Sequence, residues 1–309
     1  MLRALIQKQL ERKRQRGKQE RRSPGKAQSA VDRHTGHGRK EVGMESELRF
    51  AILIDADNVS DKYIKVILDE TANNGIATYK RIYGDWTSSR LAPWKPVLLE
   101  NSIIPMQQYS YTTGKNATDS AMIIDAMDIL YSGNVDGFCI VSSDSDFTRL
   151  AARLRESGMQ VIGMGEKKTP QPFISACNQF KYLDILYTNQ QTKEKEEAAE
   201  EAPVSGQAAV SSAQAAKQAP RDRAASNDKG LKVIRRTIND IVDKFSDDEG
   251  WLSSGMLGTQ LAKRLPDFDV RNYGFSKLTL FVKSLGNYEI GQASMGNGRK
   301  QIYVRLKKA

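Results

Sequence analysis

Between residues 48 and 187 the sequence alternates between short apolar runs and segments with helical periodicity. LRFAILIDADN (48–58) is almost continuously apolar, which is typical of a strand buried on both faces of a sheet. The next segment, SDKYIKVILDETANNG (60–75), places apolar residues at helical spacing. Repeated β-α units of this length predict an α/β domain, with a parallel sheet and helices on both of its faces. We expect five strands, with TPQPFISACNQFKYLDIL (169–186) as the closing helix.

Residues 230–309 predict a second, smaller domain of the α+β class. Three amphipathic segments predict helices, and they read LKVIRRTINDIVDKF, WLSSGMLGTQLAKRLP and FSKLTLFVKSLG. A terminal hairpin is expected where YEIGQ and KQIYVRL flank a Gly-rich turn. Three helices followed by a hairpin resemble a winged helix-turn-helix domain.

Two segments outside these domains have compositions that cannot bury a core. Residues 1–43 are basic and lack apolar periodicity, and residues 188–229 are rich in Ala, Glu, Gln, Ser and Pro and contain no aromatic residue. We therefore expect a disordered arm, whose first part could form a short basic helix, and a disordered linker, whose acidic start could extend the preceding helix. No apolar run approaches the roughly 20 residues that a membrane-spanning helix needs, so we expect no membrane partner.

The net charge of +10 is distributed unevenly along the chain. Residues 1–43 carry a formal charge of +9 and residues 230–309 carry +6, whereas residues 45–190 carry −4. Basic ends around an acidic centre favour a polyanionic partner such as a nucleic acid. A solvated surface with a basic tail is the alternative explanation.

The predicted domains lack the residues that much nucleophilic and zinc chemistry requires. The two histidines, His34 and His37, both lie in the basic arm. Cys139 and Cys177 are the only cysteines, and they fall in a predicted strand and a predicted helix as buried thiols of a reducing compartment. Ser-His and Cys-His chemistry are thereby excluded, and carboxylates would have to carry any reaction.

Acidic residues gather at the predicted carboxyl edge of the sheet, where ligands of open α/β sheets bind. Asp55 ends the first strand, and Asp144 and Asp146 follow the fourth strand in SSDSDF. Asp119 begins the helix that precedes that strand, and this end of the helix faces the same edge. Oxygen ligands from several segments suit Mg²⁺ or Mn²⁺, so we predict a divalent metal site. Taken singly, each acid could instead be a turn residue or a helix cap.

Two further acids near this edge are weaker candidates. Asp57 alternates away from Asp55 along the strand, so we leave it out of the metal ligands. Asp125 follows Asp119 by six residues, which is about 240° around a helix, so the two do not share a face. We expect Asp125 to be solvated or to support a ligand rather than to bind the metal itself.

Three motifs are similar to those of a known nuclease family. DADN (55–58), GKNATDSAMIIDAMD (114–128) and SSDSDF (142–147) resemble the NYN domain, a branch of the PIN-like nucleases, of the LabA/limkain type. The resemblance covers residues 48–187 and implies a PIN-like fold with metal-dependent ribonuclease activity. The catalytic residues that it implies are Asp55, Asn58, Asp119, Asp144 and Asp146. Asp125 also falls on an acid often seen in the family.

A mechanism follows from these acids. Mg²⁺ or Mn²⁺ held by Asp55, Asp119 and Asp144 would polarise the scissile phosphate and lower the pKa of a water molecule. Asp146 would bind the metal through water or act as a base. Lys115, in a Gly-flanked loop, is a candidate contact to the RNA backbone, although a solvated lysine explains it equally well.

The second predicted domain resembles a different family. GWLSSGMLGTQLAKRLPDFD (250–269) and YGFSKLTLFVKSLGNYEI (273–290) are similar to the LOTUS domain, also called OST-HTH. The resemblance implies RNA binding or, in some members, a protein partner. The basic residues expected to contact RNA phosphates are Lys277, Lys283, Arg299 and Lys300, and a solvated face is the alternative explanation for the lysines. Tyr273 is either a stacking platform for a base or a core residue.

Together these features predict a cytoplasmic metal-dependent endoribonuclease that binds RNA through its C-terminal domain. A basic domain on a linker would raise the local concentration of RNA near the acidic catalytic domain. The first alternative is a non-catalytic RNA-binding or regulatory protein that keeps the NYN fold. The second is a phosphatase of the haloacid type, because Asp55-Ala56-Asp57 has the spacing of that family's nucleophile motif.

Overall fold

Six parallel strands form the sheet of the N-terminal domain. The computed structural model describes residues 47–109, 117–200, 221–294 and 300–307. The strands are β1 (Arg49–Asp55), β2 (Ile76–Gly84), β3 (Ile104–Gln107), β4 (Gly137–Val141), β5 (Gln160–Gly165) and β6 (Gln179–Tyr182). Their order across the sheet is β3-β2-β1-β4-β5-β6, and each neighbouring pair is parallel. The carboxyl ends of the central strands β1 and β4 therefore lie side by side.

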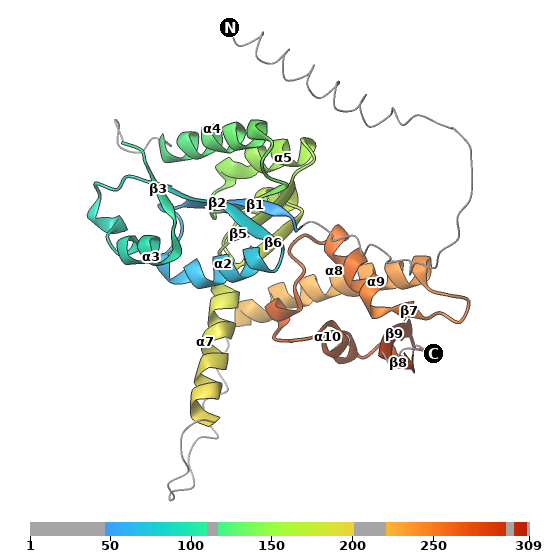
Figure 1. Cartoon of the computed structure of the whole chain (residues 1–309). Helices are drawn as coiled ribbons and strands as arrows, with labels where there is room; N and C mark the ends of the chain where they lie inside the picture. The colour runs from blue at the N-terminus through green and yellow to red at the C-terminus, as the bar shows by residue number, and fades with distance from the viewer. Residues whose placement is uncertain (1–46, 110–116, 201–220, 295–299, 308–309) are drawn as a thin grey trace, which may run out of the picture. The chain divides into compact units, whose positions relative to one another are not determined.

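Helices cover both faces of this sheet (Figure 1). They are α2 (Ile64–Ala72), α3 (Trp94–Asn101), α4 (Ala117–Ser132), α5 (Thr148–Glu156), α6 (Gln171–Ala176) and α7 (Leu183–Glu200). Because side chains alternate along β1, Ile52 and Ile54 pack on the face covered by α2 and α3. Ala51 and Leu53 pack on the opposite face, under α4 and α5. This arrangement confirms the predicted α/β class with a parallel sheet.

The closing segment of the N-terminal domain differs from the prediction. Residues 169–186 were expected to form one helix, but they contain α6, then β6, then the start of α7. Phe180 of β6 is buried beside Phe173 of α6, with ring centroids 6.0 Å apart. A strand of four residues is too short for its alternation to be told from a helical pattern, so pairing with β5 decides its conformation.

The C-terminal domain combines helices with a small antiparallel sheet. Its elements are α8 (Arg221–Phe245), β7 (Leu252–Ser253), α9 (Ser254–Arg264), η4 (Val270–Tyr273), α10 (Leu278–Ser284), β8 (Tyr288–Ser294) and β9 (Lys300–Leu306). The strand order is β7-β9-β8. Ile238 of α8, Leu257 and Leu261 of α9 and Phe281 of α10 form the centre of its core. The expected helices and hairpin are present, and β7 adds a strand that the sequence analysis did not include.

Helices occupy part of the range 188–229, which composition assigned to a linker. α7 continues to Glu200 and α8 begins at Arg221. Residues 201–220 lie outside the described residues, as does the predicted arm at 1–43. Ser46–Ala309 form one unit by their internal contacts. Within the part of the chain that the structure describes, no helix is both long enough and apolar enough to cross a bilayer.

Candidate active site

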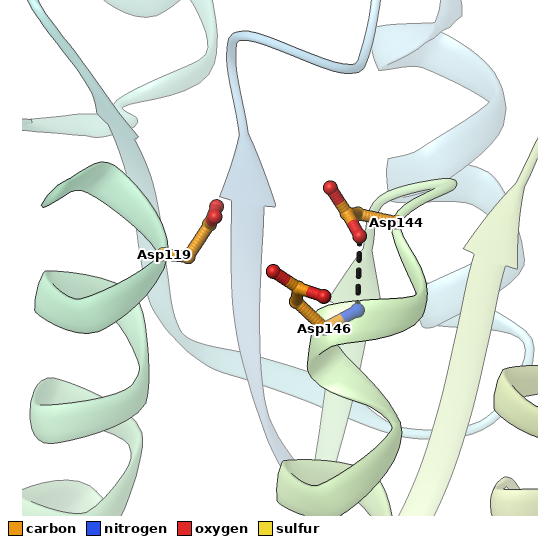
Figure 2. A group of neighbouring side chains, drawn as sticks. All are labelled: Asp119, Asp144 and Asp146. Atoms are coloured by element: carbon orange, nitrogen blue, oxygen red, sulfur yellow. Dashed lines mark hydrogen bonds between the residues drawn. The ribbon is translucent and has the colours of Figure 1, made fainter. Parts of the chain in front are cut away.

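Three aspartates from two separate segments bring their carboxylates together at the carboxyl edge of the sheet (Figure 2). One oxygen atom from each of Asp119, Asp144 and Asp146 lies within 4.8 Å of the others. Asp119 belongs to the first turn of α4, whereas Asp144 and Asp146 belong to the turn between β4 and α5. The sequence analysis expected acids from these segments at one edge, and the structure brings these three together.

A local cap holds the two acids of SSDSDF. Asp144 is the N-cap of the 3-10 turn η3 (Ser145–Phe147), and its Oδ1 accepts a hydrogen bond from the Asp146 N–H at 2.9 Å. The Asp144 N–H in turn donates to Ser142 Oγ at 3.0 Å. A cap side chain satisfies a backbone N–H that a helical turn leaves without a partner. Asp144 therefore caps the turn η3 and is also a member of the acid group.

Asp55 lies outside this group of three, although the sequence analysis included it among the metal ligands. Its side chain is fully buried. Oδ2 accepts hydrogen bonds from Asn58 Nδ2 at 2.7 Å and Ser142 Oγ at 2.8 Å, and Oδ1 accepts one from the Asp57 N–H at 3.1 Å. Burial raises the pKa of Asp55, and these hydrogen bonds oppose that shift. Asn58 thus acts on Asp55 by holding its carboxylate in place.

The carboxylates around the site repel one another. The pKa of Asp119 is raised to about 6, first because its side chain is half-buried and then because Asp55 and Asp144 carry like charge. Asp146 and Asp57 add smaller contributions in the same direction. Anionic oxygens held close together disfavour their own ionisation. A divalent cation with oxygen ligands would relieve this repulsion.

Asp119→Asn is expected to raise the melting temperature of the metal-free protein at pH 8. An unfolded aspartate titrates at about 4, so between that pH and about 6 the folded chain binds the additional proton. Stability consequently falls as the pH rises through this window and stays lower above it. The variant lacks this penalty, and because Asp119 is partly solvated the gain should be roughly 2–4 °C.

Thermal melts at pH 5 and pH 8 check this expectation. The difference between the variant and the wild type should be larger at pH 8, where Asp119 is ionised in the folded wild type. An equal difference at both pH values would contradict the proposed repulsion.

The positively charged side chain of Arg90 borders the acidic group. Arg90, in η2 (Ser89–Leu91), donates from Nη2 to Asp57 Oδ1 at 2.9 Å, and Thr118 Oγ1 donates to Asp57 Oδ2 at 3.2 Å. Asp57 therefore joins η2 to the start of α4, directly before Asp119. With its side chain 73% exposed, Arg90 adds positive charge at the rim of the site. The sequence analysis missed Arg90, because one arginine in a polar turn has no pattern that marks it.

Asp125 is held by β2 instead of joining the acid group. Its carboxylate accepts hydrogen bonds from the Arg81 guanidinium and the Tyr83 hydroxyl. Burial raises the pKa of Tyr83, and the negative charge of Asp125 raises it further. Asp125 therefore anchors α4 to the sheet, and Asp119 faces the site from the preceding turns, as helical geometry predicted.

The basic residues predicted to contact RNA are partly within the described chain. Lys277 is the N-cap of α10, Lys283 lies in the last turn of α10 and Lys300 begins β9, and all three are exposed. Lys115 and Arg299 lie outside the described residues.

A groove of about 520 Å³ lies on the C-terminal domain, lined by residues of α10, β8 and β9. Lys283 and Lys307 line it together with the apolar side chains Leu280 and Ile302. Tyr273, the candidate stacking residue, instead packs on Phe281 of the core, with ring centroids 5.1 Å apart. Tyr273 is therefore partly buried against the core, whereas the groove presents cationic and apolar side chains together.

An α/β domain with an acid group at the carboxyl edge of its sheet thus precedes a small domain of helices and an antiparallel sheet. Comparison with family models agrees with this description. The chain carries an NYN domain over residues 49–184 and an OST-HTH/LOTUS domain over residues 228–299, as the motifs predicted. NYN domains are generally nucleases, and the LOTUS domain points to RNA binding.

A crystal structure of a protein of unknown function from Vibrio parahaemolyticus is similar to part of the chain, at 20% identity and a TM-score of 0.39. The similarity covers 46% of this chain and 96% of that one. No curated protein matches the chain.

Proposed function

We propose that this protein is a cytoplasmic metal-dependent endoribonuclease whose C-terminal domain binds the RNA that its NYN domain cleaves. The observation that carries the proposal is the convergence of Asp119, Asp144 and Asp146 from separate segments within 4.8 Å. Capping explains the position of Asp144, whose Oδ1 accepts the Asp146 N–H. The convergence of the remaining carboxylates favours a shared cation.

The donor set fits Mg²⁺ or Mn²⁺. All three ligand atoms are carboxylate oxygens, the type that hard divalent cations prefer, and Mg²⁺ characteristically uses few protein carboxylates alongside water and substrate phosphate. Asp119 and Asp144 would hold the ion, and Asp146 would bind it through water. Asp55, with both oxygens hydrogen-bonded, would add negative charge nearby without needing to bind it.

The remaining roles in the reaction are assigned to side chains of the protein. A bound divalent ion supplies polarisation of a phosphoryl oxygen and a lowered pKa for water. Asp146, the exposed member of the three, is the residue that we assign to accept the proton of the attacking water. Asn58 and Ser142 orient Asp55, and the Ser142 hydroxyl also accepts the Asp144 N–H, so it links the Asp55 carboxylate to the main chain of Asp144.

The RNA-binding part of the proposal rests on the cations of the C-terminal domain. Lys283→Glu is expected to weaken binding of a single-stranded RNA roughly tenfold, and to lower the slope of log affinity against log salt by about 1. Fluorescence anisotropy across a salt series measures both quantities. Lys263→Glu, at an exposed position of α9, is the matched control with the same charge change. If the two variants bound the RNA with equal affinity, Lys283 would not be part of the RNA interface.

Hydrolysis of a fluorogenic single-stranded RNA in Mg²⁺ or Mn²⁺ tests the enzymatic part. Wild-type protein should cleave the RNA, and EDTA should stop cleavage. No signal above that of Asp144→Asn would favour the non-catalytic RNA-binding alternative.

The phosphatase alternative has little support. A haloacid-type enzyme would need the carboxylate of Asp55 to attack a phosphate in line, but this side chain is fully buried and accepts three hydrogen bonds. The carboxylate of Asp57 accepts hydrogen bonds from Arg90 and Thr118. We therefore do not assign a nucleophile to this motif.

A further inference from the structure

The segment between α9 and α10 of the C-terminal domain contacts β6 and α7 of the NYN domain. The Phe180 N–H donates to the Pro266 carbonyl oxygen at 2.8 Å. The Tyr182 hydroxyl donates to Asp267 Oδ2 at 3.0 Å. On α7, Asn189 Nδ2 donates to the carbonyl oxygen of Arg271 at 3.3 Å. Backbone and side-chain groups from both domains thus pair along one contact.

Four charged side chains form the centre of this contact. Arg271 donates from Nη1 and Nη2 to the two carboxylate oxygens of Glu70, at 2.5 and 2.9 Å. The same guanidinium binds both oxygens of Asp269, at 3.0 Å from Nε and 2.7 Å from Nη2. Lys181 Nζ completes the group, 3.0 Å from Asp269 Oδ2 and 3.8 Å from Glu70 Oε2. Two cations and two anions therefore neutralise one another across the domains.

These charges are largely withdrawn from water. The exposed fractions of the side chains are 7% for Glu70, 11% for Asp269, 15% for Lys181 and 34% for Arg271. Exposed ion pairs contribute little to stability, but a buried charge that loses its partner is strongly unfavourable. The bidentate Arg271–Glu70 pair also fixes geometry, because both planar groups must align.

Each domain contributes one cation and one anion to the group. Glu70 and Lys181 belong to the NYN domain, and Asp269 and Arg271 belong to the C-terminal domain. Each half is therefore neutral by itself, and the two halves are complementary when they meet. Such a match between segments about 200 residues apart in sequence is hard to ascribe to two unrelated solvated surfaces.

We propose that residues 266–273 are a docking element through which the C-terminal domain binds the NYN domain in one fixed orientation, with Arg271 as its central contact. The C-terminal domain then does not act as the freely moving tether that the linker composition suggested. The docking contact uses none of the acid-site residues and does not depend on the chain being a nuclease.

Amide hydrogen exchange in the full chain tests the docking element. The Phe180 N–H donates to the C-terminal domain, so its exchange reports docking directly. Arg271→Glu should accelerate exchange at Phe180 by roughly tenfold or more, because the new carboxylate would face the buried carboxylates of Glu70 and Asp269. It should also increase the radius of gyration in solution scattering. Lys263→Glu, with the same charge change on α9, should leave both quantities at their wild-type values.

Two further measurements keep the outcome interpretable. Exchange at Ile54 and Cys139, inside the sheet, should stay slow in Arg271→Glu if the NYN domain remains folded. Glu70→Gln removes the partner charge from the opposite domain, and it should accelerate Phe180 in the same direction without altering the C-terminal domain. Unchanged exchange at Phe180 in both variants, with an unchanged radius of gyration, would overturn the proposal.

Discussion

Asp144→Asn is expected to lower RNA cleavage by about 10²-fold or more while the protein keeps its fold. Asparagine is as good an N-cap as aspartate, so its side-chain oxygen can still accept the Asp146 N–H. The substitution therefore removes the negative charge from the acid group and leaves the turn intact. A loss of this size is typical when one electrostatic contact to a reacting phosphate or carbonyl is removed. Initial rates on a fluorogenic RNA in Mn²⁺ measure it.

Two companion variants separate the tasks of Asp144. Asp144→Ala should lose the same activity and in addition about 1 kcal/mol of stability, because alanine cannot cap η3. Ser145→Ala changes a neighbouring exposed residue without a change of charge and should retain most of the activity. If Asp144→Asn cleaved RNA at the wild-type rate, the acid group would not be the site of the reaction.

Gly165→Ala is expected to destabilise the protein by about 1–3 kcal/mol and to reduce cleavage more than this loss alone explains. A Cβ at this position would lie 2.6 Å from the carbonyl oxygen of Ser142 and 2.6 Å from Thr169 Oγ1. The carbonyl is main chain at the end of β4, so relief requires the turn itself to move. Ser142 holds Asp55 and the Asp144 N–H, and this movement would therefore disturb both carboxylates.

Denaturant unfolding and RNA cleavage, measured on the same preparation, check this expectation. Gly255→Ala is the control, because a Cβ there meets nothing within 4 Å and alanine favours the helix α9. Gly255→Ala should be neutral or slightly stabilising. If Gly165→Ala were as stable as the wild type, the turn after β4 would move without a loss of free energy. That result would contradict the predicted clash of the new Cβ with the Ser142 carbonyl oxygen.

The sequence predicted the elements whose signals are local and strong. The apolar run before Asp55 and the one before Asp144 are long enough to mark buried strands, and parallel strands end at a common edge. This rule was sufficient to place Asp119 near Asp144 and Asp146. It could not show that both oxygens of Asp55 accept hydrogen bonds, because these bonds depend on the exact positions of Asp57, Asn58 and Ser142.

The features that the sequence did not reveal depend on contacts between distant segments. β6 is a strand because it pairs with β5, and its four residues alone have no decisive period. Asp125 looked like a solvated or supporting acid until Arg81 and Tyr83 on β2 were seen to bind it. The Arg271–Glu70 pair spans 201 positions of sequence, so no local pattern could indicate it.

The two outer strands of the six-stranded sheet end the sheet in different ways. β3 carries Pro105, which has no N–H to offer a further strand. β6 has no proline, and its Phe180 N–H is instead covered by Pro266 of the C-terminal domain. In an NYN domain produced without residues 230–309, the outer edge of β6 would be exposed. Exposed strand edges can pair with strands of other chains. In the docked arrangement proposed above, the C-terminal domain covers this edge of the NYN domain.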